Sequence, residues 1–221
     1  MDGIQTSRFV IRSFVPDDTR GVREIAWETA FSGTESKRRK IDRELLGDLL
    51  TLYYTRFEPE SIFVADIDGE VAGYIMGSTN LFSFKINSVR IFLLRIVPGI
   101  ITRRYKGVMK SLPLLLFGIL GVLKGEHDPD IKSEYPAHLH INIGRRYQRA
   151  GLGSALINAW LRYIGLKHVK GVYLSTTSIN MKAIHFFQKH GFKPLYRYKS
   201  TFWSYASRRT VYVEILGRKI E

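Results

Sequence analysis

The alternation of apolar and polar positions along the chain predicts an α/β protein. Residues 62–67 and 70–77 alternate with the period of a β-strand and flank the dipeptide Asp68-Gly69. This dipeptide favours a type I′ hairpin turn, because both central positions of that turn need a positive φ. The same pattern predicts further strands, about seven in all, at 9–13, 137–143, 169–176, 192–198 and 210–216.

Apolar residues at helical spacing predict two helices after the first strand. The first helix can be capped by Asp17 or Asp18, and its apolar stripe consists of Val22, Ile25, Ala26 and Ala30. The second should end at Glu58-Pro59-Glu60 and repeats Leu45, Leu46, Leu49, Leu50, Tyr53 and Phe57 at helical spacing. The basic run 37–40 between them is expected to be a solvated loop.

The C-terminal half predicts two more helices. The first covers 154–164, and Gly165 can end it. The second covers 180–190. The stripe of the first comprises Leu152, Ala155, Leu156, Ala159, Trp160, Tyr163 and Ile164.

A long segment, residues 78–134, separates the third and fourth expected strands. It begins with aromatic and basic residues, contains a 12-residue apolar run at 112–123, and ends in acidic residues that include Asp128 and Asp130. An unstructured segment of this length is unusual inside a compact domain, so we expect helices within it. The apolar run is shorter than the ~18–20 residues that cross a bilayer. It is therefore expected in a core or an interface.

Charge and cysteine content narrow the class of protein. The net charge is +14, and the stretch from Val71 to Gly125 holds eight Lys or Arg and no Asp or Glu. Such a stretch is either a solvated basic face or a site for an anionic substrate, a membrane surface or a nucleic acid. The chain has no cysteine, which excludes disulfides and cysteine-ligated zinc. Since residues 1–13 lack the apolar core of a signal peptide, we expect a cytoplasmic protein.

The stretch from Gln148 to Ser154 has the composition of a phosphate-binding turn. It carries Gly151 and Gly153 and lies between an expected strand and an expected helix. The first N–H groups of a helix have no partner within the helix and attract anions. Glycine allows a ligand to approach the backbone closely. The stretch therefore predicts a site for a phosphate-bearing ligand.

This turn resembles motif A of the GCN5-related N-acetyltransferases (GNAT), in which Gln/Arg-x-x-Gly-x-Gly/Ala binds the pyrophosphate of acetyl-coenzyme A. A second block, Asn180-x-x-Ala183 followed by Phe186-Phe187 and Gly191-Phe192, resembles the motif B of the same family. The resemblance implies the GNAT fold, acetyl-CoA as cosubstrate and no metal. It assigns the cofactor to Asn142, Ile143, Gln148, Arg149, Ala150, Gly151, Leu152, Gly153, Ser154, Asn180, Ala183 and Phe187. Cofactor charge would also account for part of the basic excess, notably Arg145, Arg146 and Arg149.

The reactive groups are less clearly predicted. Family members commonly carry a proton-donating tyrosine at the position of Phe187, and phenylalanine cannot donate a proton. His138 and His140 share one face of the fourth strand, opposite Leu139, and have a suitable ordinary pKa for a base. Their spacing from Gln148 is one residue off the usual base position, so equivalence would need a β-bulge. Hydrogen-bonded interior histidines are the alternative. Glu134 and Tyr135, at the start of the strand, are rival candidates, and Glu134 could instead be a solvated loop carboxylate.

Together these patterns predict a mixed, largely antiparallel sheet of about seven strands flanked by helices, with strands four and five splayed around the pantetheine. Residues 1–221 would form a single GNAT domain with an insertion at 78–134. The implied function is acetyl transfer to a primary amine, and the acceptor is expected to be a small molecule rather than a lysine-rich peptide. A catalytically weak CoA-binding module and a membrane-associated protein stay open, as does a homodimer, whereas nucleic acid is disfavoured. The string Tyr135 to Ile141 more weakly resembles acetyltransferase-like domains related to that of O-GlcNAcase.

Overall fold

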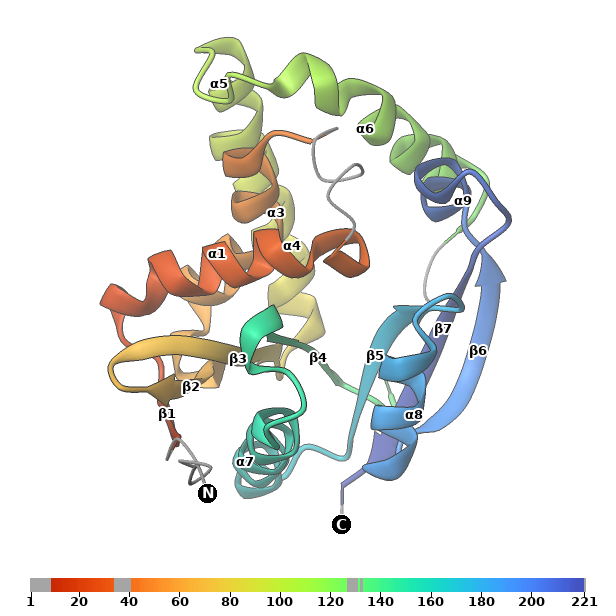
Figure 1. The fold of residues 1–221 in the computed structure, drawn as a ribbon. Coiled ribbons are helices and arrows are strands. Elements are labelled where there is room, and N and C mark those ends of the chain that lie inside the picture. Colours follow the sequence, from red (N-terminus) through yellow and green to blue (C-terminus); the bar gives the residue numbers. More distant parts are fainter. Residues whose placement is uncertain (1–8, 34–40, 127–130, 132, 221) are drawn as a thin grey trace, which may run out of the picture.

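One twisted sheet of seven strands organises the chain, in the order β1-β2-β3-β4-β5-β7-β6 (Figure 1). The computed structural model describes residues 9–33, 41–126, 131 and 133–220. All neighbouring strands are antiparallel except β4 and β5, which run parallel. The predicted fold class is confirmed. The strands are β1 Val10–Ser13, β2 Phe63–Ile67, β3 Glu70–Ser78, β4 Ala137–Ile143, β5 Gly171–Thr177, β6 Lys193–Lys199 and β7 Tyr212–Lys219.

Helices cover both faces of the sheet. Figure 1 shows α1, α3 and α4 on one side of the β1–β4 half and α7 on the other, with α8 beside β5. Each side has its own buried core: Trp160 of α7 is fully buried on one side, and Tyr54 of α3 and Tyr74 of β3 are buried on the other. The helices are α1 Thr19–Thr29, α3 Arg43–Phe57, α4 Leu81–Ile91, α5 Val97–Ile101, α6 Val108–Leu123, α7 Leu152–Leu166, α8 Met181–Lys189 and α9 Thr201–Ser207.

Local sequence signals are confirmed at the β2–β3 hairpin. Asp68 and Gly69 have φ values of 53° and 83°, as a type I′ turn requires. The carboxylate of Asp66 also accepts the N–H of Gly69 at 2.8 Å, which closes the turn. Residue chemistry within a few positions therefore accounts for this element.

Several boundary predictions were wrong. Asp18 stands at the N-cap of α1 but does not cap it, because its carboxylate is taken by Arg12 and by the N–H of Val15. Gly165 does not end α7, which runs to Leu166, and the left-handed residue beyond it is His168. Helix α9 was not predicted at all. The loop predicted at 37–40 and the acids Asp128 and Asp130 lie outside the described residues.

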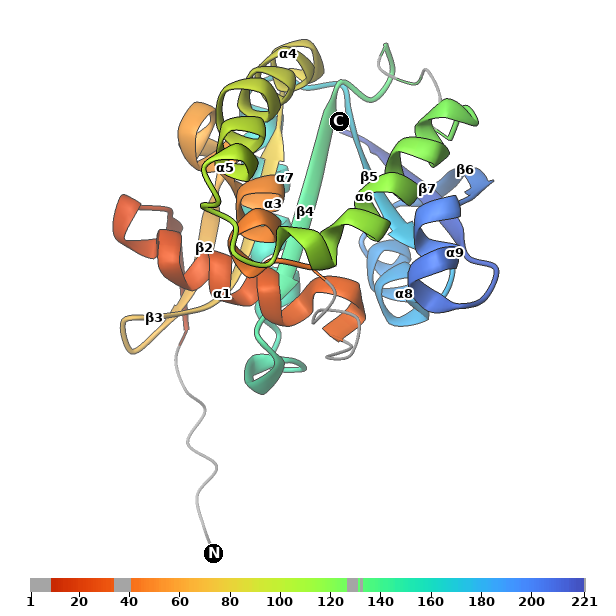
Figure 2. The ribbon, with the colours of Figure 1, turned by 90° about the horizontal axis from the view of Figure 1, so that it is seen from above.

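The described part of the segment between β3 and β4 contains helices, as predicted. It forms α4, a π-helical turn at Phe92–Ile96, α5 and then α6, which crosses to α9 (Figure 2). Asp48 of α3 is buried and anchors the segment, since it accepts the hydroxyl of Tyr105 at 2.8 Å and lies 3.6 Å and 3.8 Å from the guanidinium groups of Arg95 and Arg104. Among the described helices, none combines the length and apolarity needed to span a bilayer.

Gly77 of β3 marks the tightest contact between the sheet and α7. A Cβ at this position would lie 2.2 Å from the Trp160 ring and 2.4 Å from the His138 carbonyl oxygen. The Trp160 ring cannot shift away from an added Cβ, because it is fully buried and its indole N–H donates to the Ser61 carbonyl at 2.9 Å.

Gly77→Ala is therefore expected to lower the free energy of unfolding by about 2–4 kcal/mol through overpacking. Gly165→Ala is the matched control, since its added Cβ would meet its nearest atom at 3.8 Å. That control should be neutral or stabilising, because alanine favours helix over glycine. Urea unfolding of both variants measures the difference, and equal midpoints would contradict the packing argument.

Candidate functional site

The sheet opens where β4 and β5 separate. The two strands pair only at Ala137↔Val172 and His138↔Tyr173. Beyond this point β4 continues to pair with β3 as far as Ile143, while β5 pairs with β7 along its whole length. The β5-facing edge of β4 after His138 is thus available to a ligand, and the predicted splay is confirmed.

The predicted phosphate loop lies at the end of β4 and leads into α7. A short 3₁₀ turn, Arg145–Tyr147, leaves the strand, and the side-chain amide of Gln148 donates back to the Ile143 carbonyl at 3.4 Å. Arg149 and Gly151 then take left-handed φ values of 70° and 82°. Gly151 is the N-cap residue of α7, and no atom lies within 4 Å of the position that a Cβ would take there. The first N–H groups of α7 therefore begin at an open, exposed turn.

The cations around this loop are not equivalent. Arg145 lies 4.0 Å from Glu28, and Arg146 pairs with Glu70 while stacking over the Tyr147 ring. Two of the three arginines that the sequence assigns to cofactor charge thus already face carboxylates. Arg149 is exposed within the loop itself.

A cleft of about 380 Å³ lies at the β4–β5 opening. Polar residues from three elements enter it: His140 from β4, Ser175 from β5 and Asn180 from the start of α8. Phe31 has a φ of 54°, which is uncommon for a bulky residue and accompanies functional sites. The rest of the lining is Thr29, Ala30, Phe31, Leu46, Leu50, Thr176, Thr177, Phe202, Trp203 and Val213.

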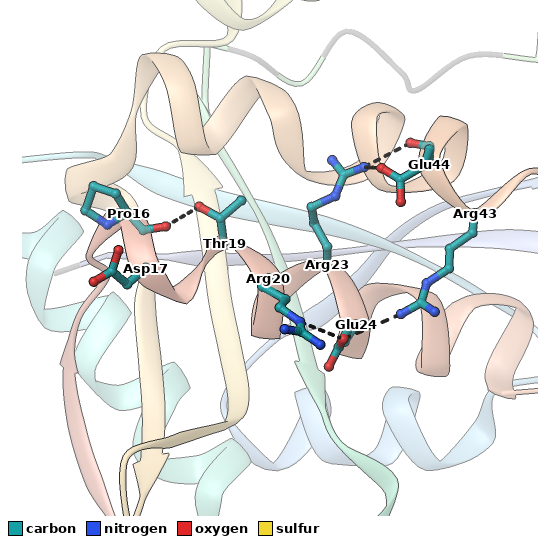
Figure 3. Close-up of a pocket in the computed structure, with 8 residues that line it drawn as sticks. All are labelled: Pro16, Asp17, Thr19, Arg20, Arg23, Glu24, Arg43 and Glu44. Carbon is teal, nitrogen blue, oxygen red and sulfur yellow. Dashed lines mark hydrogen bonds and ion pairs between the residues drawn. The ribbon is translucent and has the colours of Figure 1, made fainter. Parts of the chain in front are cut away.

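A larger recess, of about 530 Å³, lies elsewhere and has a different character (Figure 3). It runs between the N-terminal ends of α1 and α3. Its arginines are already paired with its glutamates: Arg20 and Arg43 with Glu24, and Arg23 with Glu44. None of its lining residues comes from β4, β5, α7 or α8. By volume alone, this recess would be the better candidate for the functional site. The cleft at the strand opening is the better candidate by chemistry, because polar side chains from β4, β5 and α8 converge there.

His138 is an enclosed histidine with a single polar partner. Its Nε2 lies 2.6 Å from the hydroxyl of Tyr54, its Nδ1 has no hydrogen-bond partner, and the Phe84 ring packs 4.4 Å away. Burial, with a smaller contribution from His140, holds the pKa of this imidazole well below its ordinary value. His138 is therefore neutral at physiological pH and is placed to orient its neighbours.

His140 lies two residues further along the strand and reaches the cleft. Its side chain is exposed, and its ring centroid is 5.7 Å from that of His138 and 5.9 Å from that of Tyr54. Desolvation by the surrounding protein lowers the pKa of His140 below its ordinary value. Because the ring also meets water in the cleft, we expect a smaller depression than for the enclosed His138. A neutral imidazole open to the cleft can accept a proton.

The remaining sequence hypotheses for the base differ in their surroundings. Glu134 is exposed and pairs with Lys219 at 2.6 Å, outside the residues that line the cleft. Strand β4 pairs with β3 in continuous register from Ile143 to His138, so it has no bulge that would shift a histidine to the family's usual base position. His140 is thus the candidate that combines position with access.

The predicted cofactor residues fall into three groups. The turn from Gln148 to Ser154 faces the end of β4, and Gly153 also lets α7 approach the Phe186 ring, which would lie 3.3 Å from a Cβ added at this glycine. Asn180 caps α8 by accepting the Ala183 N–H at 3.4 Å and also lines the cleft. Asn142 donates to the hydroxyl of Tyr74 at 2.8 Å, while Ile143 packs on the core under α7.

Phe187 does not line the cleft. It is buried in the core under α7, with its ring 5.5 Å from that of Phe192. Its hydrophobic environment fits phenylalanine better than a hydroxyl-bearing side chain.

Sequence reasoning missed the residues that reach the site from distant elements. Tyr54 of α3 was not among the predicted site residues, and Phe202 and Trp203 belong to the unpredicted α9. Their rings pack around Phe31, at 6.3 Å and 5.6 Å. The helix cap of α9, where Ser200 accepts the N–H of Trp203, was the one local signal that could have revealed it.

The buried histidine makes stability depend on pH. Below about pH 6.5, His138 binds a proton in the unfolded chain but stays neutral in the folded protein. The free energy of unfolding therefore decreases as the pH falls. This group alone should remove about 1 kcal/mol of stability between about pH 6.5 and 5.5. His138→Gln should flatten that decline, whereas His185→Gln, on the exposed side of α8, should not. Urea unfolding at several pH values tests this, and an unchanged pH slope in His138→Gln would contradict it.

Comparison with known proteins agrees with this geometry. The sequence profile described as "Acetyltransferase (GNAT) family" matches residues 115–192, which include the loop, α7, β5 and α8. A similar protein is N-acetyltransferase family 8 member 3 of Mus musculus, 28% identical over 81 residues. That match covers 37% of this chain and only 34% of the mouse protein, about a third of its length.

Solved structures extend the likeness to nearly the whole chain. The crystal structure of SsHAT superposes with a TM-score of 0.71 at 25% identity and covers 96% of this chain and 98% of that one. Ard1 from Thermoplasma volcanium shares the fold, with a TM-score of 0.55 at 20% identity and 96% and 98% coverage. The profile match, the fold and the loop at the end of β4 lead to one conclusion: residues 115–192 match the GNAT family of acetyltransferases, and the chain as a whole resembles solved acetyltransferases.

Proposed function

We propose that the protein transfers an acetyl group from acetyl-CoA directly to a primary amine. One observation carries the proposal: β4 has an edge that β5 leaves unpaired, it presents the exposed His140 to the cleft, and it leads at its end into the open turn at the start of α7. The match to the GNAT family and the shared fold support acetyl transfer in general. The cosubstrate, the amine acceptor and the direct route are our inference.

In this proposal the pyrophosphate of CoA binds the N–H groups of the turn from Arg149 to Ser154. The pantetheine lies along the edge of β4 beside Asn142 and Ile143, and Asn180 contacts it from the start of α8. Ala183 is small enough to let the cofactor lie close to α8. Arg149 adds positive charge at an exposed position of the turn.

The reaction needs a neutral amine, because an ammonium has no lone pair. His140 accepts the amine proton, directly or through water, and the amine nitrogen then attacks the thioester carbonyl carbon. Backbone N–H groups of β4 stabilise the resulting oxyanion. When the tetrahedral intermediate collapses, a C–N bond has formed, the C–S bond breaks and CoA leaves as a thiolate, while the amide nitrogen gives its second proton to water. A thiolate is a good leaving group near neutral pH, so a proton donor at Phe187 is not required.

The cleft suggests the kind of acceptor. Its lining is mainly apolar or aromatic, with Phe31, Phe202 and Trp203 on one wall. The eight cations between Val71 and Gly125 repel polybasic peptides and polyamines. We therefore propose a small acceptor that has one amine and some apolar or anionic character, in a single domain of 1–221 whose insertion at 78–134 covers the acceptor side.

A second candidate function rests on Phe187. With a core phenylalanine in place of a cleft tyrosine, a CoA-binding module with little catalysis is the alternative. An acetyl-transfer assay on a panel of primary amines, combined with calorimetric CoA binding, separates the two. We expect CoA release that depends on both acetyl-CoA and an amine. CoA binding without turnover on any amine would favour the module, and absence of CoA binding would refute both.

A further inference from the structure

Helix α6 presents an apolar face to the outside of the molecule. Met109, Leu112, Leu116, Ile119 and Leu123 are all exposed, and Leu123 is 77% exposed. Their spacing of three or four residues puts them on one side of the helix. The opposite side is buried, where the Ser111 hydroxyl accepts the N–H of Asp42, Leu114 packs in an apolar cluster and Gly121 lies against Glu126. Unlike a typical surface helix, α6 is therefore apolar on its outward side as well.

The exposed apolar surface is concentrated in this part of the chain. Of the 21 exposed large apolar residues in the described chain, 14 lie between residues 81 and 123. We call this segment, α4 through α6, the arch. On α4 and the following π-helical turn, Phe82, Ile86, Val89 and Leu93 repeat the same spacing. Exposed apolar patches of this kind mark interaction sites.

The charges of the arch are of one sign. Arg95 and Arg104 turn toward the buried Asp48 and belong to the anchor of the arch. The other six cations are exposed, and no acidic residue lies between Val71 and Gly125. These six are Lys85, Arg90, Arg103, Lys106, Lys110 and Lys124.

We propose that the outer face of the arch, with α6 at its centre, binds the surface of a lipid bilayer that contains anionic lipids. An apolar helix face of this type inserts into the boundary between headgroups and acyl chains. Lysine and arginine side chains beside it can extend their charged ends to the lipid phosphates. Neither feature alone identifies a bilayer, but an apolar helix face with the exposed Lys110 and Lys124 at its two ends complements an anionic one.

The same observations disfavour other occupants. In a symmetric dimer through this face, the cations of one arch would meet those of the other, with no acid in either arch to pair with them. A nucleic acid would engage the cations but leave the apolar face of α6 exposed.

Bilayer binding would bring the proposed cleft close to the lipid surface. Leu114, on the inner side of α6, packs in one cluster with Leu46 and Phe31, which line the cleft. Figure 2 shows α6 passing over this region between α3 and α9.

Vesicle flotation tests the proposal. The full chain is mixed with phosphatidylcholine vesicles, alone or with about 30% phosphatidylglycerol, at about 0.05 M and 0.5 M salt. We expect binding to the anionic vesicles that weakens at the higher salt. The variant Leu116→Gln/Ile119→Gln/Leu123→Gln should bind them about tenfold less. The matched control Val10→Gln/Val15→Gln/Leu166→Gln, which replaces similarly exposed apolar residues elsewhere, should bind as the wild type does.

A charge pair gives an independent readout. Lys110→Glu/Lys124→Glu should also reduce binding about tenfold, and Lys189→Glu/Lys193→Glu should not. Circular dichroism and thermal unfolding confirm that each variant is folded. Failure of the wild type to bind anionic vesicles at low salt would overturn the proposal, as would equal binding by the arch variants and their controls. A wild-type dimer that becomes monomeric only in the α6 variant would assign the face to a second copy instead. None of these outcomes depends on acetyl transfer.

Discussion

Gly151→Asp is expected to weaken CoA binding by at least about a hundredfold, which corresponds to about 2.7 kcal/mol. Gly151 is the N-cap of α7 and has a φ of 82°, a conformation that suits glycine. An aspartate there adds a negative charge beside the N–H groups proposed to bind the pyrophosphate. It would compete for those groups and repel the ligand. Isothermal titration calorimetry with CoA measures the loss.

A matched control separates this effect from backbone strain. Gly69, at the β2–β3 turn, has a φ of 83°, and as at Gly151 no atom lies within 4 Å of an added Cβ. Gly69→Asp should therefore cost similar strain and leave CoA affinity within a few-fold of the wild type. Gly153→Asp is less clean, because its Cβ would also press on Phe186 at 3.3 Å. If Gly151→Asp and Gly69→Asp bound CoA equally well, the turn would not be the pyrophosphate site.

His140→Ala is expected to lower kcat by about 10²- to 10⁴-fold, the usual contribution of a general base. CoA affinity should change little, since the assigned role is proton transfer. His185→Ala is the control, because His185 is an exposed histidine on α8. The pH profile adds a second readout. A base works only when unprotonated, so the lowered pKa of His140 should move the acidic fall in rate below about pH 6.5.

The rival bases make distinct predictions. Glu134→Gln should leave kcat nearly unchanged, because Glu134 is paired with Lys219 outside the cleft. If His140→Ala retained most of its activity while Glu134→Gln lost it, the assignment of the base would be wrong. His138→Gln should change kcat because His138 orients its neighbours. It should not alter the acidic fall in rate as His140→Ala does.

Much of the fold was predictable because its signals are local. The β2–β3 turn depends on two residues, Asp68 and Gly69, and the loop before α7 depends on glycines within one turn of each other. The stripe of α7 repeats apolar residues over fifteen positions, from Leu152 to Leu166. Each signal is complete within a short stretch of chain, so tertiary contacts were not needed to recognise it.

Helix α9 shows where local reasoning fails. Its seven residues, Thr201–Ser207, are rich in aromatic side chains, a composition that also suits a strand. A helix this short gains little from propensity. It is held instead by α6, where the Tyr205 ring stacks on Phe117 at 3.8 Å, and by Glu126, which accepts the N–H of Thr201 at 2.7 Å. Those partners lie at least 75 residues away in sequence.

The two histidines of β4 illustrate the same division. The sequence by itself determined that His138 and His140 share a face of one strand, because side chains alternate with a period of two. Only the tertiary structure distinguished them. Tyr54, 84 residues away, encloses His138, while the separation of β5 from β4 opens His140 to the cleft. Periodicity and turn chemistry are properties of neighbouring residues, whereas burial, and with it pKa, depends on which distant elements pack around a side chain.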